Sequence, residues 1–287
     1  SQLTDIDKAV TPIEFLREYL ETRVAEFDNT RLMGVHRVRE DFTKFMSSIK
    51  RDVNFMVQQF EMRKSADAYA RQQVNKTGVL DTEKLHSYKL TDDIFLRQTI
   101  TPDGKSHGMV MLIDWSGSMQ DKVVATTKQL LVLAQFCRKV GIAFDVYTFT
   151  CTGYGTPTCD PDVDADDLDM RVATNGPQLV HVLSSSTKRS EMDQDMRNLL
   201  GNAYSLAGGG YYYPTSTYLH MGGTPLNNTM FFYPELIRRL KDRSGAQKIS
   251  TVTITDGEST PLYFTQCGTY DRLVNRMVSP YETILIK

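Results

Sequence analysis

The chain has 287 residues, which is enough for one large domain or for one domain with a sizeable extension. Its 33 basic and 35 acidic side chains leave a formal net charge of −2, so nothing favours nonspecific binding to nucleic acid. No apolar stretch approaches the roughly 20 residues that cross a bilayer, and the first residues do not resemble a signal peptide. We therefore expect a cytoplasmic protein without nucleic-acid or membrane partners.

Two helices are predicted within residues 1–93, which we expect to form an α-helical N-terminal extension. Apolar residues at steps of three and four predict the first helix over residues 12–27 and a longer one over residues 38–75. The second half of the longer helix is far more polar, and two interpretations stay open: a solvated helix face or a docking arm for a partner. The charges of such an arm would be Arg63, Lys64 and Arg71.

A strand over residues 94–100, a turn at residues 101–104 and a second strand from His107 onward predict a hairpin. His107 lies at the beginning of the second strand. Because ligands of an α/β sheet bind beyond the carboxyl ends of its strands, we do not expect His107 to have a chemical role.

The second strand ends in the most informative segment of the chain. An apolar run finishes at Asp114, Ser116 and Ser118 follow in a tight turn, and then a segment with helical apolar spacing begins. One carboxylate and two hydroxyls form a hard, oxygen-only ligand set that suits Mg²⁺ or Mn²⁺ rather than zinc. The plainer alternative is a strand, a turn and a helix with capping serines.

An acidic segment at residues 160–169 follows the next predicted strand, at residues 142–149. Four aspartates alternate there as in a calcium loop: Asp160, Asp162, Asp164 and Asp166. However, Ala165 stands where such a loop needs glycine, and Arg171 stands where it needs a bidentate glutamate. We therefore expect a solvated acidic loop.

The four cysteines are sparse and form no Cys-x-x-Cys pair, so we expect no zinc site. Cys137 falls within the helix after the serines and is expected to be a small buried apolar residue. Cys151 and Cys159 are close enough in sequence to bridge, but reduced thiols are expected in a cytosolic chain.

The remaining elements continue an alternation of strands and helices that indicates an α/β fold. They are strands at residues 178–184, 248–255 and 282–286, and helices at residues 191–206, 226–243 and 270–277. The helix at residues 226–243 is expected to be interrupted at Pro234. The chain ends after its last strand, so we expect a further C-terminal piece to be absent.

The Asp-x-Ser-x-Ser signature resembles the metal-ion-dependent adhesion site of von Willebrand factor A domains. That family completes the site with a threonine in a later loop and an aspartate after a later strand, and Thr224 and Asp256 stand in the matching order and context. The resemblance covers residues 94–287. It implies a Rossmann-like α/β domain with a mostly parallel central sheet and surrounding helices, here with an insertion at about residues 150–222.

The resemblance also implies a role for each site residue. Ser116 and Ser118 would bind the ion directly, Thr224 directly or through water, and Asp114 and Asp256 mostly through water. One coordination position would remain for an aspartate or glutamate of a target protein. No catalytic residue is implied.

Two segments further resemble the C-terminal region of the CobT subunit of aerobic cobaltochelatase, versions of which are carried by large bacteriophages. They are Gly78-x-Leu80-Asp81 and Leu112-Ile113-Asp114-x-Ser116-Gly117-Ser118-Met119. The resemblance implies a partner that is a MoxR-type AAA+ ATPase, similar to the CobS hexamer, and a chelatase or protein-remodelling activity.

Three functions remain open. The first is a non-catalytic, Mg²⁺-dependent adaptor for such an ATPase, and the second is a structural or adhesion-like binding protein, for instance of a phage particle, without a motor. The third is a metal-dependent hydrolase with His220 as its candidate base. The chain itself carries no ATPase motif, because no Gly-Lys-Ser/Thr follows the glycines at residues 208–210.

Overall fold

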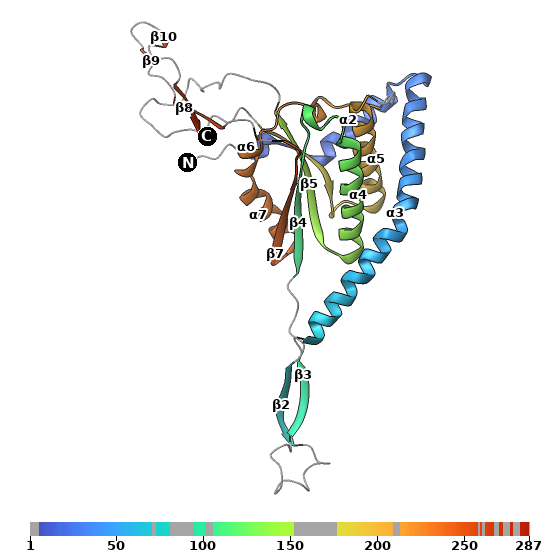
Figure 1. The fold of residues 1–287 in the computed structure, drawn as a ribbon, viewed down its shortest axis with the longest axis vertical. Helices are drawn as coiled ribbons and strands as arrows, with labels where there is room; N and C mark the ends of the chain where they lie inside the picture. The colour runs from blue at the N-terminus through green and yellow to red at the C-terminus, as the bar shows by residue number, and fades with distance from the viewer. Residues whose placement is uncertain are drawn as a thin grey trace.

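The body of the protein is a five-stranded sheet with helices on both faces (Figure 1). The computed structural model describes residues 6–70, 73–80, 95–100, 106–151, 177–208, 213–257, 259, 262–266, 270–271, 276–277 and 282–286. Within these residues no helix is both long enough and apolar enough to cross a membrane.

The sheet has the strand order β1-β6-β5-β4-β7. Its strands are β1 (Val10–Thr11), β4 (His107–Asp114), β5 (Ala143–Cys151), β6 (Pro177–Ser184) and β7 (Lys248–Ile254). The central strand β4 pairs in parallel with β5 and β7, β1 pairs in parallel with β6, and only the β5–β6 pair is antiparallel. The prediction of an α/β fold with a mostly parallel sheet is therefore confirmed.

Four helices cover one face of the sheet, and three shorter ones lie against the other. The first set is α2 (Ile13–Ala25), α3 (Asn29–Ala70), α4 (Val123–Val140) and α5 (Arg189–Leu206). The second set is α1 (Ile6–Ala9), α6 (Leu226–Met230) and α7 (Tyr233–Ser244). The helix expected over residues 226–243 is interrupted, but before Pro234 rather than at it: α6 ends at Met230, α7 begins at Tyr233, and Pro234 lies in the first turn of α7, where its missing N–H costs nothing.

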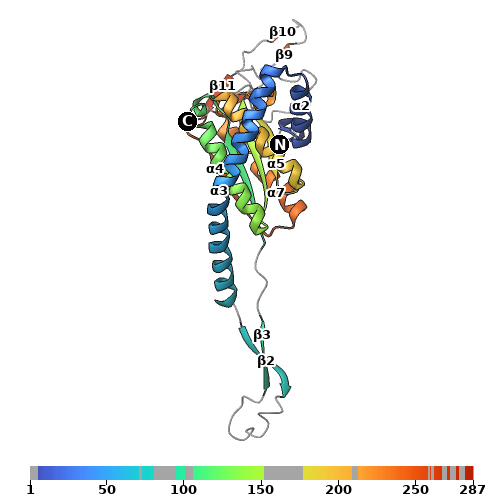
Figure 2. The same cartoon turned by 90° about the vertical axis from the view of Figure 1, so that its right-hand side faces the viewer.

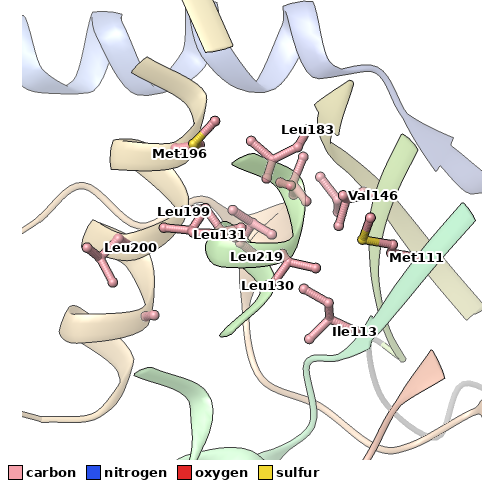
Figure 3. Close-up of a cluster of buried hydrophobic side chains, with 14 of the residues drawn as sticks. Met111, Ile113, Leu130, Leu131, Val146, Leu183, Met196, Leu199, Leu200 and Leu219 are labelled. Carbon is pink, nitrogen blue, oxygen red and sulfur yellow. The ribbon is translucent and has the colours of Figure 1, made fainter. Parts of the chain in front are cut away.

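The near-continuous apolar run of β4 is explained by burial on both faces. Met111 and Ile113 point into the core beneath α4 and α5 (Figure 3), whereas Val110 and Leu112 pack toward α7. Leu130 and Leu131 of α4, which are almost fully buried, face the first of these cores. Burial of each such leucine stabilises the fold by about 1.5–3 kcal/mol. Packing of the apolar faces of α4 and β4 therefore stabilises the signature strand at the centre of the sheet.

The predicted hairpin between residues 94–100 and the signature strand is wrong. Strand β3 (Phe95–Ile100) pairs antiparallel with β2 (Gln73–Leu80), while both edges of β4 are occupied by β5 and β7. The physical reason is that β4 is apolar on both faces and lies at the centre of the sheet. A strand beside it would also be buried, and the more polar sequence of β3 does not suit that position. Helix α3 also begins earlier and ends earlier than the predicted residues 38–75.

The second half of α3 and the β2–β3 hairpin project away from the sheet (Figures 1 and 2). Along this half of the helix, Met62 is 50% exposed and Tyr69 is 76% exposed. With 42 residues the helix is about 63 Å long. Exposure of this segment agrees with both sequence interpretations, a solvated face and a docking arm.

Residues on either side of the expected domain boundaries share one core. Strand β1 completes one edge of the sheet, and Leu16 and Leu20 of α2 pack in the same core as α4. Arg17 donates two hydrogen bonds to Asp195 of α5, at 2.9 and 2.8 Å. Both β6 and α5 fall within the segment expected as an insertion, at about residues 150–222; its acidic loop at residues 160–169 lies outside the described residues.

The last part of the chain forms two small antiparallel pairs. Strand β8 (Leu262–Gln266) pairs with β11 (Glu282–Ile286), which confirms the last predicted strand. The predicted helix at residues 270–277 is wrong, because β9 (Tyr270–Asp271) pairs with β10 (Arg276–Met277). Short paired segments of two residues carry too little pattern for a sequence to distinguish them from a helical turn.

Candidate metal centre

Two aspartates lie at the same edge of the sheet because β4 and β7 end together. In the parallel register of these strands Ile113 is opposite Ile254. Asp114 is the last residue of β4, and Asp256 comes two residues after the end of β7. Both follow the carboxyl ends of neighbouring parallel strands, where ligands of open α/β sheets bind.

The two serines of the signature connect this edge through hydrogen bonds. The Oγ atoms of Ser116 and Ser118 are 3.0 Å apart, and Ser118 Oγ donates to Oδ1 of Asp256 at 2.9 Å. Ser116 directly precedes the 3₁₀ helix η2 (Gly117–Met119) and Ser118 lies within it, before the start of α4. The structure thus brings Ser116, Ser118 and Asp256 together as predicted.

Asp114 is fully buried and only half satisfied. Thr255 Oγ1 donates to its Oδ2 at 2.6 Å, but Oδ1 is buried and accepts no hydrogen bond of normal geometry from any described residue. Burial raises the pKa of Asp114, hydrogen-bond donors of Thr255 and Ser116 oppose that shift, and the charge of Asp256 adds to it. A buried carboxylate oxygen without a partner is costly, and a cation at this edge would stabilise it.

The Thr224 loop is held against the signature by its backbone. Gly222 forms a bridge with Ser116, and its carbonyl oxygen accepts a hydrogen bond of 2.9 Å from the Gly117 N–H. A Cβ at Gly222 would lie only 2.0 Å from the carbonyl oxygen of Cys151, so no other residue fits this approach. Thr224 is buried and follows two residues later, within about 7 Å of Gly222 along the chain.

An indole hydrogen bond gives the loop a second attachment. Trp115 lies between Asp114 and Ser116, and its side chain is fully buried. Its Nε1–H donates to the carbonyl oxygen of Leu219 at 3.0 Å, and its backbone N–H donates to Phe149 at the end of β5. The signature is therefore attached to two other segments by Trp115, one of the two residues that its polar pattern leaves unassigned.

Lys122 places a positive charge against Asp256. Its Nζ lies 2.8 Å from Oδ2 of Asp256, and the lysine side chain is 62% exposed. The hydrogen bond from Lys122, followed by that from Ser118, lowers the pKa of Asp256. This ammonium group would compete with a metal ion for the Asp256 carboxylate.

The residues at this edge fit a hard divalent ion. The five predicted site residues offer two carboxylates and three hydroxyls, all of them oxygen ligands, which suits Mg²⁺ or Mn²⁺ and not zinc. Across the described ranges no group of three or more His, Cys, Asp or Glu side chains could hold a metal ion. Metal binding at this edge would therefore depend on the hydroxyls of Ser116, Ser118 and Thr224 and on water.

Sequence reasoning missed Lys122 and Thr255. Thr255 directly precedes Asp256, so a search for hydroxyls next to the predicted carboxylates would have found it. Lys122 directly precedes the first residue of α4, and its closeness to Asp256 could be inferred only once the start of this helix was known. His107 begins β4, about 23 Å of strand away from Asp114, as its position in the sequence predicted.

Comparison with protein-family models, with curated proteins and with solved structures finds no significant match for this chain. The resemblance to von Willebrand A domains thus rests on the five residues Asp114, Ser116, Ser118, Thr224 and Asp256. What can be concluded about function follows from the geometry of this one edge of the sheet: a buried carboxylate, hydrogen-bonded hydroxyls and a second carboxylate that holds a cation.

Proposed function

We propose that the protein is a non-catalytic adaptor that binds Mg²⁺, or Mn²⁺, and through it an acidic residue of a partner protein. The ion would be held at the metal-ion-dependent adhesion site of a von Willebrand A-like domain, by Asp114, Ser116, Ser118, Thr224 and Asp256. The observation that carries the proposal is the buried Oδ1 atom of Asp114, which has no described hydrogen-bond partner beside two hydrogen-bonded serines.

The roles of the residues follow from their contacts. Ser116 and Ser118 present their hydroxyls toward each other and would bind the ion. Asp256 orients Ser118 by accepting a hydrogen bond from its hydroxyl, and Asp114 supplies negative charge from within the sheet. A bound Mg²⁺ retains several waters in an octahedral shell, so one water position is available for exchange with a partner carboxylate.

The proposed partner is a MoxR-type AAA+ ATPase similar to CobS, and the proposed setting is a chelatase or protein-remodelling complex in the cytoplasm. The resemblance of the signature to CobT supports this choice. The alternative is a structural or adhesion-like protein, for instance of a phage particle, that uses the same site without a motor. The projecting second half of α3 supports the alternative, because its apolar side chains Met62 and Tyr69 are exposed and could take part in assembly.

The test is affinity capture from native lysate in Mg²⁺ and again in EDTA, followed by mass spectrometry of the retained proteins. Wild type is compared with Ser116→Ala and with Ser190→Ala, an exposed serine in the first turn of α5 that serves as the matched control. Circular dichroism checks that each variant is folded. We expect an AAA+ ATPase to be retained by wild type and Ser190→Ala in Mg²⁺ only.

Two results would redirect the proposal. Capture of the same proteins in EDTA and by Ser116→Ala would contradict a metal-dependent adaptor. Mg²⁺-dependent capture of particle proteins, unaffected by ATP and without an ATPase, would support the structural alternative.

A further inference from the structure

The two edges of the sheet differ in length and in composition. Strand β1, at one edge, has two residues, and Pro12, which has no N–H to donate to a neighbouring strand, follows it directly. Strand β7, at the other edge, has seven residues and no proline. Among the described strands only β4 pairs with β7. The first edge therefore offers little backbone for further pairing, whereas the second offers a whole strand.

The sequence of β7 lacks the features that usually protect an edge strand. Such strands carry charges, proline or a bulge, which prevent pairing with another chain. Lys248, the first residue of β7, is its only charged residue, and the register with β4 runs without a shift from Lys248 to Ile254. Five of the seven residues are β-branched, the type that fits a pleated sheet: Ile249, Thr251, Val252, Thr253 and Ile254. This edge therefore favours the addition of another strand.

The helices leave this edge accessible. Helix α7 packs over β4 and β5 on one face of the sheet, and α4 packs over β5 on the other (Figure 1). Ser250 and Thr251, in the middle of β7, are exposed, whereas Met111 of the neighbouring strand β4 is fully buried. Because successive residues of a strand point to opposite faces, both faces of the sheet are open to solvent at β7.

We propose that two copies of this chain pair through β7, with the two strands antiparallel. A two-fold axis perpendicular to the sheet makes two equal edge strands antiparallel, and two-fold dimers are the commonest oligomers of a single chain. The register that overlaps all seven residues is centred on Thr251. It places Ile249 opposite Thr253 of the other copy and Ser250 opposite Val252 of the other copy, and the residues of each pair point to the same face.

The charge of β7 favours this antiparallel arrangement over a parallel one. With the strands antiparallel, the two Lys248 residues lie at opposite ends of the interface, and each lies near the end of the other strand that leads to Asp256. Parallel strands with the same overlap would place the two Lys248 residues side by side, where like charges are destabilising. At the centre the two Thr251 residues lie opposite each other, a pair that stabilises antiparallel strands.

Pairing through β7 does not depend on the candidate metal centre. The seven residues of the interface include none of the five predicted ligands, and Asp256 follows two residues after the strand ends. The dimer is therefore measured in EDTA and can fail independently of the proposed function. Because each copy contributes one strand, the interface is small, and we expect a dissociation constant of about 1–100 µM.

The test is sedimentation velocity of the purified chain in EDTA, at protein concentrations from about 1 to 200 µM. The variants Thr251→Lys and Thr251→Glu are measured separately and then as an equimolar mixture. The matched controls are Ser190→Lys and Ser190→Glu, which introduce the same charges at an exposed serine of α5, a helix that packs against β6. Circular dichroism checks that each variant is folded.

We expect wild type and both Ser190 variants to dimerise equally. Thr251→Lys and Thr251→Glu each place two like charges directly opposite, so each alone is expected to dimerise about tenfold more weakly. In the mixture a lysine lies opposite a glutamate, and dimerisation is expected to return to about the wild-type level. Only a register in which position 251 meets position 251 of the other copy gives this recovery.

Three results would overturn the proposal. The first is a folded wild type that stays monomeric at all these concentrations. The second is a dimer that Thr251→Lys leaves unchanged; its loss in Met62→Lys would then place the contact on the exposed second half of α3. The third is weakening by both Thr251 variants without recovery in the mixture, which would contradict the antiparallel register.

Discussion

Asp114 and Asp145 lie on neighbouring strands and are almost equally buried, at 0% and 1% exposure, but they are surrounded very differently. Asp145 has an arginine and a histidine beside it; burial alone would raise its pKa, but His181 and Arg243 outweigh burial and lower it. Asp114 has only the donors of Thr255 and Ser116 beside it, one of its oxygens accepts no hydrogen bond of normal geometry from a described residue, and burial raises its pKa. A buried carboxylate that is fully compensated stabilises the fold, whereas an uncompensated one marks a place that a ligand can complete.

The largest expected effect follows from neutralising the compensated aspartate. Asp145→Asn keeps the shape of the side chain but leaves Arg243 without its counter-charge and removes the carboxylate beside His181. We expect the free energy of unfolding to fall by about 2–3 kcal/mol, less than for a fully enclosed pair because Arg243 is 37% exposed. Urea denaturation at neutral pH measures the change. Unchanged stability would mean that Asp145 is not a structural residue, and the contrast between Asp145 and Asp114 would not hold.

The pH dependence of the same pair sharpens the comparison. Because the pKa of folded Asp145 is lowered, its stabilisation is present above the unfolded value of about 3.9 and is lost as the pH falls through the folded pKa. The groups that face Asp145 are His181 and Tyr147 from the sheet and Arg239 and Arg243 from α7. Unfolding of wild type and Asp145→Asn between pH 7 and pH 2 is expected to converge below about pH 3.9; a constant difference would contradict this assignment.

Neutralising Asp114, the uncompensated aspartate, is expected to raise the free energy of unfolding rather than lower it. In EDTA, Asp114→Asn removes a buried charge, and the amide oxygen can still accept from Thr255, so unfolding is expected to require about 1 kcal/mol more than in wild type. Mg²⁺ at a hundred times its dissociation constant is expected to stabilise wild type by about 2.7 kcal/mol and the variant not at all. Thermal unfolding with and without the ion tests both parts. A gain of equal size in the variant would place the ion elsewhere.

The smallest expected effect concerns the lysine that competes for Asp256. Lys122→Gln removes the ammonium group from Oδ2, which frees the carboxylate for a divalent ion. Because the lysine side chain is 62% exposed, the competition is weak, and Mg²⁺ is expected to bind about two- to fivefold more tightly. Calorimetric titration with MgCl₂ measures the difference, and Lys128→Gln, further along α4, is the matched control. Weaker binding in Lys122→Gln would mean that the lysine supports the site.

Local pattern predicted the elements better than their partners. The apolar run before Asp114 and the helical spacing after it were sufficient for β4 and α4, because burial on a face imposes a period on the sequence. This periodicity does not indicate which strands are neighbours in a sheet, so the pairing of β3 with β2 was missed. The antiparallel position of β6 next to β5 was equally invisible in the sequence.

The two polar clusters differ in the same way. The candidate metal centre was predicted because Asp114, Ser116 and Ser118 are adjacent in sequence and belong to a recognisable pattern. The cluster of Asp145, His181 and Arg243 was missed because its members come from three separate elements, and each alone is an ordinary residue of a strand or helix. Only the fold brings them together.

The close approach of Gly222 has a consequence for hydrogen exchange. The loop before Thr224 is tied to the turn after β4 and to the end of β5, since Gly222 is bridged to Ser116 and Gly223 to Cys151. A loop joined at two strands cannot fluctuate on its own, so the Gly117 amide, which donates to Gly222, is expected to exchange only when the sheet itself opens. The element that carries Thr224 is by this measure part of the core, although its sequence is that of a turn.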